Sequence, residues 1–100
     1  MAELTIDGPL VPKGYEQLTG LSGVKTLTVP AGAWIADVQS DPTANKDVRF
    51  RMDGTPPTAT VGEAIQALAT KRFVGRAILE ALVFIEEGAS AKINVTYYGG

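Results

Sequence analysis

The sequence predicts a small all-β domain, an antiparallel β-sandwich or jelly roll that allows for one short helical segment. Three observations favour this fold. About six or seven short segments alternate apolar and polar residues, which is the period expected of strands with one buried face. Gly, Pro and Asp residues separate these segments at a spacing of roughly eight to twelve residues. The 100 residues contain no internal repeat, so we expect one globular unit.

The clearest strand and turn signals lie together in residues 48–61, which read V-R-F-R-M-D-G-T-P-P-T-A-T-V. Apolar residues alternate with two arginines over Val48–Met52, so the apolar side chains are expected to point inward and the arginines outward. Asp53-Gly54 favours a tight reversal, which predicts a central hairpin. Pro56 and Pro57 then remove two backbone donors, so this part of the chain is expected to run along an edge and to offer a contact surface.

Alternation predicts further strands on both sides of this hairpin. The last of them, Ala91–Tyr98, is the most regular, and its odd-numbered residues are expected to face the core. Trp34 falls on one face with other apolar residues and is also expected in the core, as is Phe50. One helical turn is expected over Ile78–Leu82. Besides the strand at residues 48–52, the predicted strands comprise residues 24–29, 34–39, 71–75, 83–86 and 91–98.

Residues 1–23 differ from the rest of the chain, because Gly and Pro interrupt short apolar pieces. They are expected to form an extended N-terminal arm with an edge strand at Leu4–Ile6, while the sandwich occupies residues 24–100. Helix-forming residues over 63–70 conflict with the surrounding β pattern. The sequence therefore leaves the conformation of that segment open.

Composition argues against most enzyme mechanisms. The chain has no cysteine and no histidine, which removes thiolate chemistry, the commonest general base and the commonest metal ligand. The acidic loop Asp41–Asp47 lacks the ligand spacing and the glycine of a calcium-binding EF-hand loop. The doublet Glu86-Glu87 lies in a predicted strand, where neighbouring side chains face opposite ways. We therefore expect no enzyme and no catalytic, metal-binding or cofactor-binding residues.

Charge and hydropathy argue against two further classes of partner. The net charge of −2 provides no field to attract nucleic acid or anionic lipid. No apolar run approaches the roughly 18 residues of a membrane span, and the N-terminus lacks the pattern of a signal peptide, so synthesis in a cytoplasm is expected. The glycosylation sequon Asn94-Val95-Thr96 falls within a predicted strand and is interpreted as accidental.

Three segments together resemble a group of small virion structural proteins of tailed bacteriophages. They are T-L-T-V-P-A-G-A at residues 26–33, R-F-R-M-D-G-T-P-P-T-A-T-V-G at residues 49–62, and A-K-I-N-V-T-Y-Y at residues 91–98. The resemblance covers roughly residues 24–98 and departs from the family pattern at residues 63–70. It implies a compact β-sandwich, commonly assembled as a symmetric oligomer, that brings no catalytic residues.

The resemblance implies a capsid decoration (cement) protein, a head fibre or a tail-associated module, and capsid decoration is the leading hypothesis. Such a protein would bind the outside of the phage head as a homotrimeric cement that contacts the major capsid protein and stabilises the shell. The alternative is a tail, fibre or baseplate module, in which Tyr15 or Tyr98 stacks on a host-surface glycan. The expected interface residues are Leu4, Ile6, Tyr15, Pro56, Pro57 and Tyr98.

Overall fold

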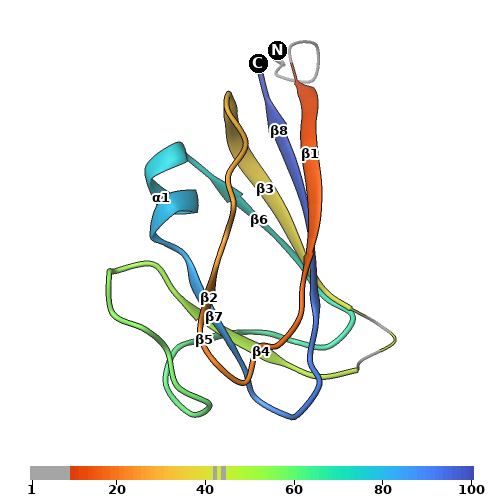
Figure 1. Cartoon of the computed structure of the whole chain (residues 1–100), viewed down its shortest axis with the longest axis vertical. Helices are drawn as coiled ribbons and strands as arrows, with labels where there is room; N and C mark the ends of the chain where they lie inside the picture. The colour runs from red at the N-terminus through yellow and green to blue at the C-terminus, as the bar shows by residue number, and fades with distance from the viewer. Residues whose placement is uncertain (1–9, 42, 44) are drawn as a thin grey trace, which may run out of the picture.

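The fold is seen in a computed structural model that describes residues 10–41, 43 and 45–100. Within these residues there are eight strands and one short helix, and the strands form two antiparallel four-stranded sheets that face each other (Figure 1). The all-β prediction is therefore confirmed. The elements are β1 Val11–Leu18, β2 Lys25–Thr26, β3 Ala33–Ser40, β4 Val48–Arg51, β5 Glu63–Ile65, β6 Thr70–Val74, α1 Arg76–Ala81, β7 Val83–Glu86 and β8 Ile93–Gly99.

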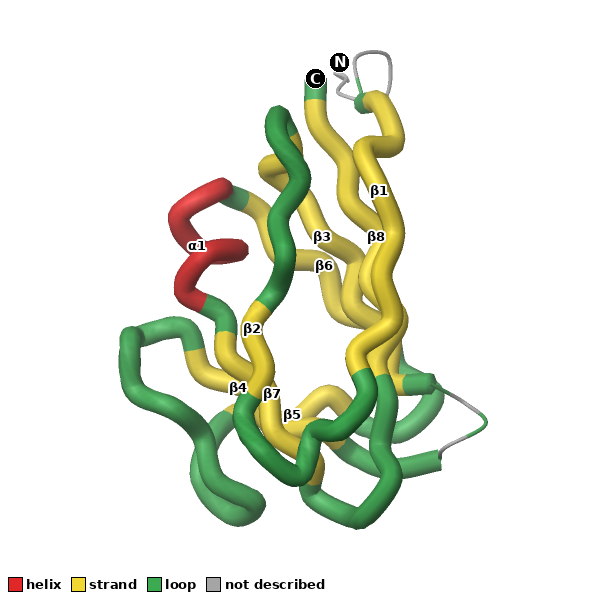
Figure 2. Tube along the Cα trace, in the orientation of Figure 1, coloured by secondary structure: helices red, strands yellow, loops and turns green. Residues whose placement is uncertain are grey.

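The strand order identifies the sandwich as a jelly roll. One sheet has the order β1-β8-β3-β6 and the other has the order β2-β7-β4-β5 (Figure 2). Strand β1 pairs with β8, β2 with β7, β3 with β6 and β4 with β5. This pairing is that of one long hairpin wrapped into two layers, with β3-β8 and β4-β7 as the additional contacts that the wrapping creates.

The core fills the space between the two sheets. Phe50, on β4, is almost completely buried and meets the ring of Phe73 edge to face, with centroids 5.1 Å apart. The odd-numbered residues of Ala91–Tyr97 all face this core, as their alternation predicted. Tyr97 donates its hydroxyl hydrogen bond to the carboxylate of Glu16, and burial together with this bond raises the pKa of the Tyr97 hydroxyl.

The prediction that Trp34 belongs to the core is wrong. The pairing of β3 with β8 shifts register between Ala33 and Ile35, so the strand contains a β-bulge at this point. A bulge inserts one extra residue and reverses the phase of the alternation. Ala33 and Ala36 consequently both face the core, while Trp34 remains 36% exposed.

The predicted N-terminal arm is also wrong for the part of it that the structure describes. Val11–Leu18 forms the strand β1, which pairs with β8 from Val11 opposite Gly99 to Leu18 opposite Ile93. Leu21, three residues beyond β1, is completely buried. The proposed boundary at residue 23 therefore does not separate an arm from the sandwich. The predicted edge strand at residues 4–6 lies outside the described residues.

The segment 63–70, which the sequence left open, continues the β structure. Glu63–Ile65 forms β5 and pairs with β4 as a hairpin. The predicted tight reversal at Asp53-Gly54 is wrong, because the loop of residues 52–62 joins the two strands. Leu68 adopts a positive φ of 72° in the turn that follows, which is incompatible with the helix that the local residues favour. Sheet pairing has thus overridden helix propensity.

Candidate functional surfaces

Three rows of side chains cross the outer face of the β1-β8-β3-β6 sheet. Cross-strand pairing, together with the alternation of each strand, brings one residue from every strand into each row. One row is polar throughout and another is largely apolar, so the surface changes character along the strands. In strand order, the rows are Gln17-Asn94-Gln39-Thr70, Tyr15-Thr96-Asp37-Arg72 and Pro12-Tyr98-Ile35-Val74.

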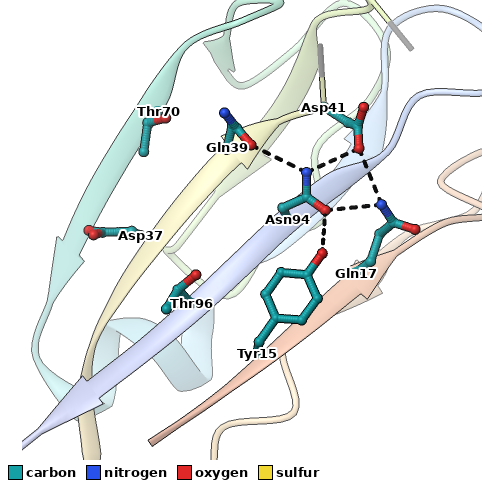
Figure 3. Close-up of a pocket in the computed structure, with 8 residues that line it drawn as sticks. All are labelled: Tyr15, Gln17, Asp37, Gln39, Asp41, Thr70, Asn94 and Thr96. Atoms are coloured by element: carbon teal, nitrogen blue, oxygen red, sulfur yellow. Dashed lines mark hydrogen bonds between the residues drawn. The ribbon is translucent and has the colours of Figure 1, made fainter. Parts of the chain in front are cut away.

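Asn94 connects the polar side chains of this face (Figure 3). Its Oδ1 accepts hydrogen bonds from the hydroxyl of Tyr15 at 2.7 Å and from Nε2 of Gln17 at 3.0 Å. Its Nδ2 donates to Oε1 of Gln39 at 3.3 Å and to Oδ2 of Asp41 at 3.0 Å. The Asn94 amide therefore uses both donors and both acceptor positions, and it fixes four neighbouring side chains.

Asp41 supplies the negative charge of this network. The hydroxyl of Thr43 donates to its carboxylate, as do the Asn94 amide and the backbone N–H of Thr43. These bonds favour the ionised form and lower the pKa of Asp41 from 3.8 to about 2, with a smaller contribution from the positive charge of Lys92. The carboxylate is thus ionised at neutral pH.

The neighbouring row contains an ion pair. Arg72 binds Asp37 through two bonds, Nε to Oδ1 at 2.7 Å and the terminal nitrogen to Oδ2 at 2.9 Å. The guanidinium also lies 5.6 Å from the ring centroid of Tyr98. The charge of Arg72 is therefore already matched by Asp37, and both side chains are held in place.

The polar part of the face forms an open hollow of about 570 Å³. Among the residues that line it are two carboxylates and neither a lysine nor an arginine. Strands β1, β8, β3 and β6 all contribute to its floor, as Figure 3 shows. The lining residues are Tyr15, Gln17, Asp37, Gln39, Asp41, Thr70, Asn94 and Thr96.

A second surface, which we call the apolar end, comprises Val11, Trp34, Val74 and Ile78. Each of these side chains is between 36% and 51% exposed. A backbone hydrogen bond of 2.7 Å from Gly75 to Trp34 joins β6 to β3 beside Val74, and the side chain of Ile78 lies against Gly75. Val11 pairs with Gly99, which in turn pairs with Ala33 next to Trp34. The start of β1 and the C-terminus lie at this end of the molecule (Figure 1).

The expected interface residues are distributed over different parts of the molecule. Tyr15, 63% exposed, and the partly buried Tyr98 share the outer sheet face. Pro56 is exposed but Pro57 is buried, in the loop that joins β4 to β5 of the other sheet. Leu4 and Ile6 lie outside the described residues. The structure thus brings the two tyrosines onto one surface and leaves Pro56 exposed in a loop of the other sheet. The prediction that Pro57 is an interface residue is wrong for this chain, because its side chain is buried.

Sequence reasoning missed most of the polar network. The sequon at Asn94 and the acidic loop that begins at Asp41 carry no sign of a hydrogen bond between these two side chains. Gln17 lay in the presumed arm, so its pairing opposite Asn94 could not be foreseen. The outward alternation of Ala91–Tyr98 did indicate that Asn94 is accessible.

A metal centre and a membrane-spanning helix are both lacking among the residues that the structure describes. In the described part of the chain, no group of three or more Asp and Glu side chains could hold a metal ion. No helix among those residues is long and apolar enough to cross a membrane. Comparisons with protein-family models, with curated proteins and with solved structures give no match for this chain.

Proposed function

We propose that this protein is a structural component of a tailed-bacteriophage virion. It acts as a cement protein that binds the outside of the head, contacts the major capsid protein and stabilises the shell. The proposal combines the resemblance of residues 24–98 to such virion proteins with the jelly-roll topology, which recurs in viral capsid proteins and in lectin domains. Since fold alone does not define function, the proposal depends on a surface that is suited to attachment.

The observation that supports attachment most directly is the apolar end. It comprises four large, partly exposed apolar side chains at the start of β1, near the start of β3, at the end of β6 and on α1. Complete burial of one such side chain contributes roughly 1.5–3 kcal/mol relative to full exposure. With about half of each already buried, the four together have a few kcal/mol left to gain from a partner. Repetition over a capsid lattice multiplies this modest affinity through avidity.

The proposed assembly is a homotrimer. Each sheet ends in two edge strands, β1 and β6 in one and β2 and β5 in the other. Edge strands present unpaired backbone groups, which proteins protect by covering them or by pairing them with a neighbour. A closed symmetric ring buries such edges in equivalent contacts. Light scattering of the purified protein at high concentration is expected to give the mass of a trimer, and a strict monomer would contradict this part of the proposal.

Capsid binding tests the attachment directly. Purified protein is added to capsids that lack it, and retention after sedimentation and the melting temperature of the shell are measured. Trp34→Ala combined with Ile78→Ala is expected to reduce retention at least tenfold. Val61→Ala serves as the matched control, because Val61 is an exposed apolar residue in the loop between β4 and β5. Undiminished retention of the double variant would overturn the proposed surface.

A further inference from the structure

We propose that the hollow on the outer face of the β1-β8-β3-β6 sheet binds a neutral oligosaccharide. This inference goes beyond capsid attachment and does not depend on it, since the hollow and the apolar end are formed by different side chains. Four features of the hollow support it: its polar groups, its rigidity, its charge and its exposed aromatic ring.

The polar groups match the chemistry of sugar hydroxyls. A hydroxyl both donates and accepts hydrogen bonds, so its partners must supply both functions side by side. Within the described residues, Oε1 of Gln17, Nε2 of Gln39 and the hydroxyls of Thr70 and Thr96 make no hydrogen bond to another side chain. They offer an acceptor, a donor and two groups that serve as either. Such a mixture suits a polyol better than an apolar ligand.

The side chains that form the hollow are held before any ligand arrives. Asn94 uses its whole hydrogen-bonding capacity to position Tyr15, Gln17, Gln39 and Asp41. All of the lining residues lie on strands or, in the case of Asp41, directly after one. Groups that are already ordered lose little conformational entropy on binding. A weakly interacting ligand such as a sugar benefits most from this arrangement.

The charge of the hollow selects a neutral ligand. Asp41 and Asp37 are both acidic, and the only cation in direct contact with them in the described part of the chain is Arg72, which binds Asp37 through two hydrogen bonds. An anionic sugar would approach the carboxylate of Asp41, whose charged neighbour Lys92 does not line the hollow, and would find no cation among the lining residues. Sialylated, sulfated and phosphorylated glycans are therefore disfavoured.

Tyr15 supplies a flat apolar surface beside these polar groups. Tyr15 is 63% exposed, while its hydroxyl donates a hydrogen bond to Oδ1 of Asn94 at 2.7 Å. Aromatic rings fixed in this way stack well on the C–H faces of pyranose rings. Strands lie about 4.8 Å apart, so a row across four strands spans about 14 Å, which fits a short oligosaccharide better than a single sugar.

The test begins with an array of neutral and acidic oligosaccharides. Wild-type protein is applied to the array, and solution titrations with maltohexaose, cellohexaose and xylohexaose, followed by amide chemical shifts, measure affinity and locate the contacts. We expect millimolar or tighter binding of at least one neutral glycan, with the largest shifts on β1, β3 and β8. Absence of binding to every neutral glycan, or tighter binding of acidic ones, would overturn the proposal.

Variants then separate stacking from hydrogen bonding. Tyr15→Ala and Gln39→Ala are each expected to weaken binding about tenfold, whereas Tyr15→Phe keeps the ring and should retain more of the affinity than Tyr15→Ala. Val61→Ala, on the loop of the other sheet, should leave affinity unchanged, and unaltered amide spectra away from the hollow confirm that each variant is folded. Equal affinity of wild type, Tyr15→Ala and Gln39→Ala would rule out this site.

The same variants keep this inference distinct from the proposed capsid function. Tyr15→Ala should leave capsid retention intact, and Trp34→Ala should leave glycan binding intact. Loss of both activities in either variant would show that one surface performs both tasks and would contradict the separation of the two sites.

Discussion

Replacing Phe50 by Ala is expected to remove a large part of the stability of this fold. The side chain is 1% exposed and packs between two rings, with centroid distances of 5.1 Å to Phe73 and 6.2 Å to Phe84. Truncating a buried phenylalanine to alanine costs about 3–5 kcal/mol, because apolar burial is lost and a cavity remains. Since domains of this size have a total stability of about 5–15 kcal/mol, the variant is expected to be marginal or unfolded at 37 °C.

Urea denaturation and thermal unfolding, both followed by circular dichroism, measure this loss. At about 4–8 °C per kcal/mol for a domain of this length, the melting temperature should fall by roughly 12–40 °C. Arg51→Ala is the matched control on the same strand, since Arg51 points outward and its ion pair with Asp53 is at the surface. That variant should shift the melting temperature only slightly. Small and equal shifts for Phe50→Ala and Arg51→Ala would refute the assignment of inner and outer faces on β4.

Three further predictions follow from individual contacts. Gly99→Ala should destabilise the fold by about 1–3 kcal/mol in urea, because its Cβ would lie 2.0 Å from the carbonyl oxygen of Gly32, whereas Gly23→Ala, with no atom within 4 Å, should have little effect. The pKa of Asp41 is lowered in the folded state, so its contribution to stability is present above the unfolded value of 3.8 and is lost as the pH falls toward about 2. Asp41→Asn should therefore reduce the dependence of the unfolding free energy on pH in this range. An unchanged pH dependence in that variant would count against the network. A chain that begins at Val24 lacks β1 and the buried Leu21 and should not fold, and a cooperative melting transition in that shortened chain would show that β1 is dispensable.

Much of the core could be predicted from the sequence because strand alternation is local. A few neighbouring residues are enough to assign each side chain to the inner or the outer face of its strand. This holds for the odd-numbered residues from Ala91 to Tyr97 and for Phe50 with its flanking arginines. The short helix was also predicted, although α1 begins at Arg76 and not at Ile78. Of the candidate site, the outward directions of Asn94, Thr96 and Tyr98 followed from the alternation of Ala91–Tyr98, and those of Asp37 and Gln39 from the alternation of residues 34–39.

The sequence by itself determined the fold class, since the period of its apolar residues and the positions of its turn-forming residues suffice for an all-β domain. Only the tertiary structure decided the phase of β3, because a one-residue bulge against β8 turns Trp34 outward without any mark in the local pattern. It also decided that Val11–Leu18 is a strand, since the partner that stabilises β1 lies about eighty residues further along the chain. The polar network around Asn94 follows from the same long-range pairing, which places Gln17 from β1, and Gln39 and Asp41 from β3 and its end, beside Asn94. Local propensity cannot encode such contacts, because the register between distant strands is set by the packing of the whole core.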